Sequence, residues 1–228
     1  MTKFLPLILL VLYAFMMMRF SAWRTRKMLD QNSQPLTDPS ITRLADRMAA
    51  AMGIPKIAVN VFEVDPVNGL AAPDGRIFLT RGFLNRKARG EVTAEELATV
   101  IAHEMGHVAQ GHMRRRMIDF TGQNAVFVML SALLNRILPF VGIWIANLIS
   151  TALMARLSRR DEFEADAWAT ALLIRSGIGT GPQKSLFRKL DALTQNRAGG
   201  SPAWLLSHPG VAERIAAIEA NEARWAGG

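Results

Sequence analysis

The chain has 228 residues, a net charge of +8, no cysteine, and 50% hydrophobic residues with a positive mean hydropathy. Without cysteine it can form neither disulfides nor cysteine-ligated zinc sites. The length fits one catalytic domain with or without membrane segments, and the apolar composition favours membrane contact. The basic charge is compatible with nucleic acid or with an anionic membrane, but no nucleic-acid motif is present, so we predict a lipid bilayer and no nucleic acid as partner.

The chain begins with an uncharged apolar stretch, residues 4–18, followed by a basic flank, residues 19–27. A cleaved signal peptide needs small residues before its cleavage site, and Phe20-Ser21-Ala22 fits that need poorly. An uncleaved anchor fits better, and residues 20–23 extend it toward a bilayer-spanning length. We therefore predict a membrane helix with its basic flank in residues 1–29. The positive-inside rule then places the rest of the chain in the cytoplasm.

A polar linker, residues 30–38, leads to a helix whose signals are Asp38 as N-cap, Pro39 in its first turn and Gly53 at its end. Three extended pieces follow, at residues 57–64, 66–72 and 76–80, with a turn at 73–75. They predict a small antiparallel sheet. Asn68, in the middle piece, is either a turn former or an amide on an edge strand that binds the backbone of a peptide substrate.

A helix predicted over residues 93–116 carries the sequence H-E-x-x-H. Thr93 and Glu96 form a capping box at its start. His103 and His107 are four residues apart and share a face, which is the spacing of two zinc ligands on one helix. Glu104 lies about 100° around the helix, where it can act as general base. A chance match on a solvated helix is the alternative.

His112 lies five residues beyond His107. On a continuous helix it turns away from the metal face, so we predict a solvated or interfacial histidine rather than a ligand.

A second apolar block covers residues 124–155 and is interrupted by Asn135-Arg136 and Pro139. Two full crossings need about 40 apolar residues, which the block lacks. It is therefore a short or re-entrant hairpin, an interfacial helical pair, or a helical pair buried against the domain.

A helix predicted over residues 158–175 carries four acidic residues. These are either a solvated face or the source of a third metal ligand. Glu162 and Asp166 are four residues apart and share a face, so Glu162 can bind the metal while Asp166 fixes the tautomer of a ligand histidine. Glu164 points elsewhere.

The C-terminal part contains a predicted amphipathic helix at residues 180–196, a glycine-rich loop at 197–202, and a last helix that opens at Ser207-His208-Pro209. His208 is either a helix cap or a hydrogen-bond donor to the oxyanion of a peptide-hydrolysis intermediate. Arg214 follows six residues later.

Four stretches together resemble the membrane zinc metalloendopeptidases that include HtpX and the CAAX prenyl proteases. The stretches are Asn68–Gly75 with Phe78–Gly82, His103–His107, Ser158–Asp166, and Ser207–Pro209 with Arg214. They occur in the family's order over about residues 40 to 220.

The resemblance implies one zinc ion per chain on His103, His107 and Glu162, with Glu104 as catalytic base and Asp166 as support. It also implies that His208 and Arg214 lie near the oxyanion and that Asn68 lies on the substrate-binding strand. A CAAX protease encloses a large chamber with many spans, so the resemblance favours a smaller, HtpX-like protein.

We therefore predict a mostly helical α+β fold: a zincin-like domain over residues 30–228, with a small antiparallel sheet beside the H-E-x-x-H helix and a membrane-associated insertion at 124–155. The expected function is a membrane-anchored zinc endopeptidase. By resemblance, its substrates are membrane proteins under quality control. Its expected location is a membrane, the inner or cytoplasmic membrane if the protein is bacterial, with the catalytic domain on the cytoplasmic side. The alternative is a non-proteolytic membrane-bound zinc module that acts as chaperone or scaffold.

Overall fold

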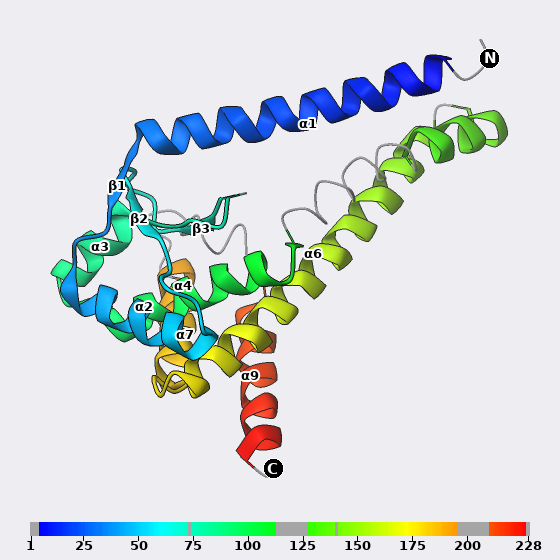
Figure 1. The fold of residues 1–228 in the computed structure, drawn as a ribbon. Coiled ribbons are helices and arrows are strands. Elements are labelled where there is room, and N and C mark those ends of the chain that lie inside the picture. Colours follow the sequence, from blue (N-terminus) through cyan, green and yellow to red (C-terminus); the bar gives the residue numbers. More distant parts are fainter. Residues whose placement is uncertain (1–4, 73, 113–126, 140, 196–209, 227–228) are drawn as a thin grey trace.

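The computed structural model describes residues 5–72, 74–112, 127–139, 141–195 and 210–226 (Figure 1). Within them the fold is mostly helical with one small mixed sheet. The elements are α1 (Leu5–Gln31), β1 (Ser33–Pro35), α2 (Pro39–Met52), β2 (Val59–Phe62), β3 (Gly69–Ala71), β4 (Ile77–Thr80), α3 (Arg81–Ala88), α4 (Ala94–Ala109), α6 (Gly142–Arg175), α7 (Gly181–Gln195) and α9 (Val211–Ala226).

The helix α2 begins and ends where its capping residues predict. The Asp38 side chain accepts hydrogen bonds from the backbone N–H groups of Ser40 and Ile41, and Gly53 closes the helix with a φ of 70°. The buried face of α2 consists of apolar side chains at helical spacing, including Ile41, Leu44 and Met48. Local capping and periodicity therefore account for this helix.

The sheet has the order β1-β2-β4-β3, and the prediction of an antiparallel sheet is wrong for its central pair. β2 and β4 are parallel, with Val59 opposite Ile77, while the outer pairs are antiparallel. The meander prediction assumed that successive strands pair. Instead β3 and β4 form a hairpin, and the connection after β2 carries the chain to the far edge, so that β4 lies between β2 and β3. Residues 33–35, predicted as linker, form β1, and α3 was not predicted.

The helix α4 lies at the centre of the domain, in contact with α2, α6, α7, β3 and β4 (Figure 1). All of its residues from Glu96 to His107 are buried. The apolar ones, such as Leu97 and Ile101, pack in the core with Met48 and Leu173. Its capping box is present as predicted, with reciprocal bonds between Thr93 and Glu96. The helix ends at Ala109, seven residues before the predicted end at residue 116.

The helix α6 has two different halves. Its second half is in the domain, and its first half forms an arm that projects away from it together with residues 127–137, which are also helical (Figure 1). Large apolar side chains on the arm are exposed, such as Trp144 at 74% and Leu148 at 70%. The arm therefore does not pack against the domain. Within the described residues, none of the helices, α1 included, has both the length and the apolarity of a bilayer span.

The carboxylate of Asp38 offers a test of how α2 is stabilised. Burial would raise its pKa, but hydrogen bonds from Lys87, Ser40 and Ile41 lower it to about 2. Asp38→Ala is expected to lower the free energy of unfolding by about 1 kcal/mol near pH 7. The pKa is lower in the folded state, so this contribution is complete above the ordinary aspartate pKa of 3.8 and is lost as the pH falls toward 2.

Urea denaturation near pH 7 and near pH 2 measures the effect. Asp38→Asn is the matched control, because an asparagine caps the helix without the charge. A loss of stability for Asp38→Ala that is the same at both pH values would show that the charge of Asp38 does not contribute.

Candidate metal centre

The helices α4 and α6 cross in backbone contact at Gly106. A Cβ atom on Gly106 would lie 2.7 Å from the backbone oxygen of Ala165 and 3.0 Å from its Cα. Only glycine allows this approach, because any side chain would meet backbone that cannot move aside. The crossing places the histidines that flank Gly106 on α4 directly beside the acidic residues that flank Ala165 on α6.

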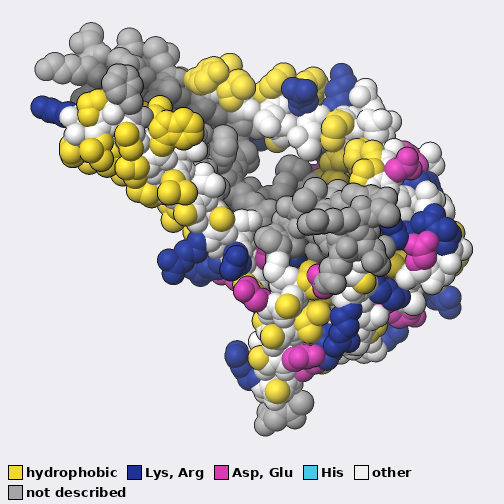
Figure 2. Space-filling view, turned by 180° about the vertical axis from the view of Figure 1, so that it is seen from behind, with side chains coloured by type: hydrophobic (Ala, Val, Ile, Leu, Met, Phe, Trp, Pro, Cys, Tyr) yellow, Lys and Arg dark blue, Asp and Glu magenta, His cyan; other side chains and the backbone are white. Residues whose placement is uncertain are grey.

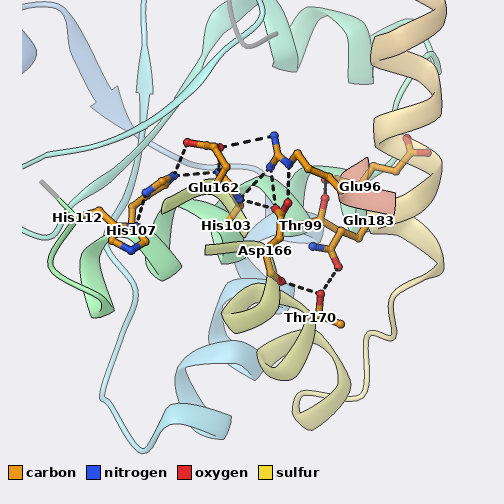
Figure 3. Close-up of polar contacts among 10 residues, drawn as sticks. Glu96, Thr99, His103, His107, His112, Glu162, Asp166, Thr170 and Gln183 are labelled. Carbon is orange, nitrogen blue, oxygen red and sulfur yellow. Dashed lines mark hydrogen bonds and ion pairs between the residues drawn. The ribbon is translucent and has the colours of Figure 1, made fainter. Parts of the chain in front are cut away.

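Three predicted metal ligands come together at this crossing (Figure 3). The Nε2 atoms of His103 and His107 are 3.1 Å apart. The two Glu162 oxygens lie 3.3 Å from His103 Nε2 and 3.4 Å from His107 Nε2. A tetrahedral ion with ligand bonds of about 2.0–2.1 Å requires ligand atoms about 3.3 Å apart. The three buried side chains therefore have the donor atoms and the spacing that a zinc ion needs.

The side chains of His103, His107 and Glu162 form the ligand cluster. Asp166 supports His103 from the side of the ring that points away from this cluster. Its Oδ1 lies 2.8 Å from His103 Nδ1, which leaves Nε2 to face Glu162 (Figure 3). Burial would lower the pKa of His103, but the bonds with Asp166 and Glu162 raise it to about 9. The carboxylates around His103 thus favour a positive charge in this buried pocket. A bound cation would supply that charge and leave His103 neutral, with a lone pair on Nε2.

Arg214 of α9 is fully buried and binds Asp166 with two of its nitrogens, Nε at 2.5 Å and Nη2 at 2.7 Å. Its Nη1 lies 3.6 Å from Glu162. Burial would raise the pKa of Asp166, but the adjacent guanidinium holds it below its ordinary value. These contacts fix the carboxylates that face the histidines. The contact of Arg214 with an oxyanion stays a prediction.

The structure overturns the prediction that His112 is solvated or interfacial. His112 is buried, and its Nδ1 lies 2.8 Å from His107 Nδ1 (Figure 3). The prediction assumed that the helix continues. Instead α4 ends at Ala109 and the chain reverses at Gly111, with a φ of 67°, which directs His112 back toward the site. A glycine between the two histidines was the sequence signal for this reversal.

The edge strand β3 lies close against Glu104. A Cβ atom on Gly69 would be 2.4 Å from Val100 Cγ1 and 3.4 Å from Glu104 Oε1. Among the described strands, β3 is at one edge of the sheet. Asn68 directly precedes it and donates its backbone N–H to Thr80 Oγ1 at 2.9 Å. The predicted base and the predicted substrate-binding strand are therefore neighbours. His208 lies outside the described residues.

Three carboxylates and one guanidinium are buried around the two histidines, which gives the centre a net formal charge of −2 when both histidines are neutral. The groups are Glu104, Glu162, Asp166 and Arg214. A divalent cation neutralises this charge, whereas without one the buried carboxylates repel each other. The fold and this centre define a class of protein, a mostly helical α+β domain with an H-E-x-x-H pair beside a buried glutamate.

Comparisons with known proteins agree with this class. Residues 35–222 match the model of peptidase family M48. The chain is 29% identical to metalloprotease LoiP of Escherichia coli over 76% of this chain and 66% of LoiP. It is 28% identical to mitochondrial metalloendopeptidase OMA1 of Schizosaccharomyces pombe over 78% of this chain and 51% of OMA1. A protease HtpX homolog of Variovorax paradoxus is 24% identical, over 86% of this chain and 77% of the homolog.

The chain belongs to peptidase family M48. The predicted HtpX-like family and the predicted enzyme class, a metalloendopeptidase, are thereby confirmed. The matched region spans less than two thirds of LoiP and about half of OMA1.

The crossing of α4 and α6 can be tested at Gly106. Gly106→Ala is expected to separate the helices, because the new methyl group meets the backbone of Ala165. The ligand histidines of α4 and Glu162 of α6 then move apart, so we expect at least about tenfold less bound zinc and a loss of about 1–3 kcal/mol in unfolding free energy.

Metal analysis of the purified protein and urea denaturation measure these effects. Gly181→Ala is the matched control, since no atom lies within 4 Å of a Cβ at this first position of α7. Full zinc content in Gly106→Ala would show that the close crossing is not required for the site.

Proposed function

We propose that the chain is a zinc-dependent endopeptidase with one ion per chain, bound by His103, His107 and Glu162. The observation that carries this proposal is the convergence of two Nε2 atoms, 3.1 Å apart, on the carboxylate of Glu162, whose two oxygens lie 3.3 and 3.4 Å from them. These distances are close to those between the ligands of a tetrahedral zinc ion. A structural site would use four protein ligands. Among the described residues three converge, which is the arrangement of a catalytic site with one open position.

Bound zinc supplies Lewis acidity, which lowers the pKa of water and polarises a scissile carbonyl. Glu104 accepts a proton from the attacking water and passes it to the leaving amine. Glu104 follows the ligand histidine His103 on α4 and lies against Gly69 of β3. This place would let it serve a water at the metal and a peptide along β3. Asp166 holds His103 with Nε2 toward Glu162, where it would bind the metal.

The substrate enters as an extended peptide along the edge of β3. An unpaired strand edge offers backbone hydrogen bonds to a peptide, which gives affinity for many sequences. Asn68 lies at the start of this edge and binds the substrate backbone through its side-chain amide. His208, together with Arg214, stabilises the oxyanion of the intermediate.

The protein works at a membrane. The arm of α6 exposes a band of large apolar side chains, and the arginines that follow it on the same helix lie next to this band (Figure 2). Apolar side chains of α1, such as Phe15 and Phe20, are also exposed. We assign residues 1–29 as membrane anchor, residues 124–155 as membrane-associated insertion and residues 30–228 as the peptidase domain, on the cytoplasmic side of the inner membrane if the protein is bacterial. Membrane proteins in quality control are then the accessible substrates.

Glu104→Gln separates the proposed peptidase from the alternative zinc module. The amide cannot accept the proton, so casein cleavage is expected to fall by about 10²–10⁴-fold. The zinc content is expected to stay at the wild-type level, because Glu104 is not one of the three ligands.

Glu95→Gln is the matched control, since Glu95 is an exposed residue in the first turn of the same helix. Wild-type cleavage by Glu104→Gln with zinc bound would overturn the proposed mechanism. A wild-type protein that binds zinc and cleaves no protein would favour the chaperone or scaffold role.

Membrane contact through the arm is tested with Trp144→Glu. Removal of one large apolar side chain from lipid costs about 1.5–3 kcal/mol, so binding of the full chain to vesicles with anionic lipid is expected to weaken about tenfold or more. Trp225→Glu is the matched control, because Trp225 is an exposed tryptophan on α9 in a different part of the domain. Equal vesicle binding by Trp144→Glu and the wild type, measured by flotation, would show that the arm does not contact lipid.

A further inference from the structure

His112 connects the ligand cluster to a second pair of carboxylates. Its Nδ1 lies 2.8 Å from His107 Nδ1, and its Nε2 lies 3.2 Å from a Glu164 oxygen and 3.8 Å from an Asp161 oxygen. The His112 ring is fully buried, and Asp161 is 3% exposed. Four side chains therefore form a connected row. Asp161 and Glu164 of α6 contact one side of the His112 ring, and His107 contacts the other side.

A single hydrogen lies between the two Nδ1 atoms, because one of them must donate and the other must accept. Suppose that His112 donates. A neutral His107 then carries its own hydrogen on Nε2, which faces His103 and Glu162 and could not bind a metal. Suppose instead that His107 donates. Its Nε2 then presents a lone pair to the cluster, as a metal ligand must.

The carboxylates at the other end decide between these two states. An ionised carboxylate only accepts hydrogen bonds, so His112 must carry its hydrogen on Nε2, which faces Glu164 and Asp161. A neutral His112 then has a bare Nδ1, which can only accept from His107. The charge on α6 thus selects the tautomers of both rings, one after the other.

We propose that His112 is a positioning residue for the metal: it passes the tautomer preference of Glu164 and Asp161 to His107 and so holds His107 Nε2 ready for zinc. This inference rests on the proposed zinc site. His103 receives the same support from Asp166 directly, at 2.8 Å. For His107 the histidine ring bridges the longer distance to the carboxylates.

The tautomers can be read by NMR on zinc-loaded protein labelled with ¹⁵N in the histidine rings. The chain has only four histidines, so few ring signals need assignment. We expect the hydrogen of His107 on Nδ1 and that of His112 on Nε2. A His112 ring with its hydrogen on Nδ1 in the zinc-loaded protein would overturn the proposal, whatever the activity of the sample.

Zinc affinity, measured by competition with a chelator, tests the energetic consequence. His112→Phe fills the buried space but offers no acceptor, and loss of such a supporting contact weakens metal binding by about 10–100-fold. His112→Asn places an amide oxygen near the former Nδ1 and is expected to retain most of the affinity. If the Phe variant does not fold, the comparison of His112→Asn with the wild type and the NMR result still decide.

Arg160→Gln is the matched control, because Arg160 binds the outer oxygen of Glu164 at 2.7 Å and contacts neither His112 nor His107 in the described structure. We expect its zinc affinity to match the wild type. Wild-type zinc affinity in His112→Phe would overturn the proposal that His112 positions His107. A second zinc ion that is lost in His112→Phe while the first keeps its affinity would also overturn it, in favour of a separate cation site. A wild-type protein without zinc would instead contradict the proposed function itself.

Discussion

The close crossing of α4 and α6 at Gly106 and Ala165 is the constraint on which the candidate metal centre depends. Backbone contact at this point leaves no room for a Cβ atom. His103 and His107 are one turn apart on α4, and Glu162 and Asp166 are one turn apart on α6. The crossing places these two pairs side by side. Side chains as short as those of Asp166 and Glu162 can then reach the imidazoles at 2.8–3.4 Å. A wider crossing would leave buried charges without partners, which is costly.

The second half of α6 contributes to both histidines from opposite directions. Glu162 contacts the Nε2 atoms of both His103 and His107. Asp166 contacts the opposite nitrogen of His103, Nδ1. Arg214 then neutralises part of the buried negative charge and fixes Asp166 with two contacts. The ligand cluster is thus held by charged groups in mutual contact, so each depends on the position of the others.

Local signals in the sequence predicted local structure well. The caps of α2 and the capping box of α4 are confirmed, because a cap is a bond between residues two to four apart. Local signals could not predict the order of the strands or the burial of His112. The parallel pairing of β2 with β4 depends on where a loop crosses the sheet, and the burial of His112 depends on a chain reversal at Gly111. The site roles of Asn68 and His208 stay predictions.

The sequence by itself determined which donor atoms the chain offers. It also determined that the two histidines share one helix face and that Glu162 and Asp166 share a face of a later helix, because side chains four residues apart lie on the same side of an α-helix. Only the tertiary structure decided which carboxylate faces which imidazole. That choice depends on how deeply and at which residues two helices cross, and the crossing is fixed by contacts between Gly106 and Ala165, 59 positions apart in the chain.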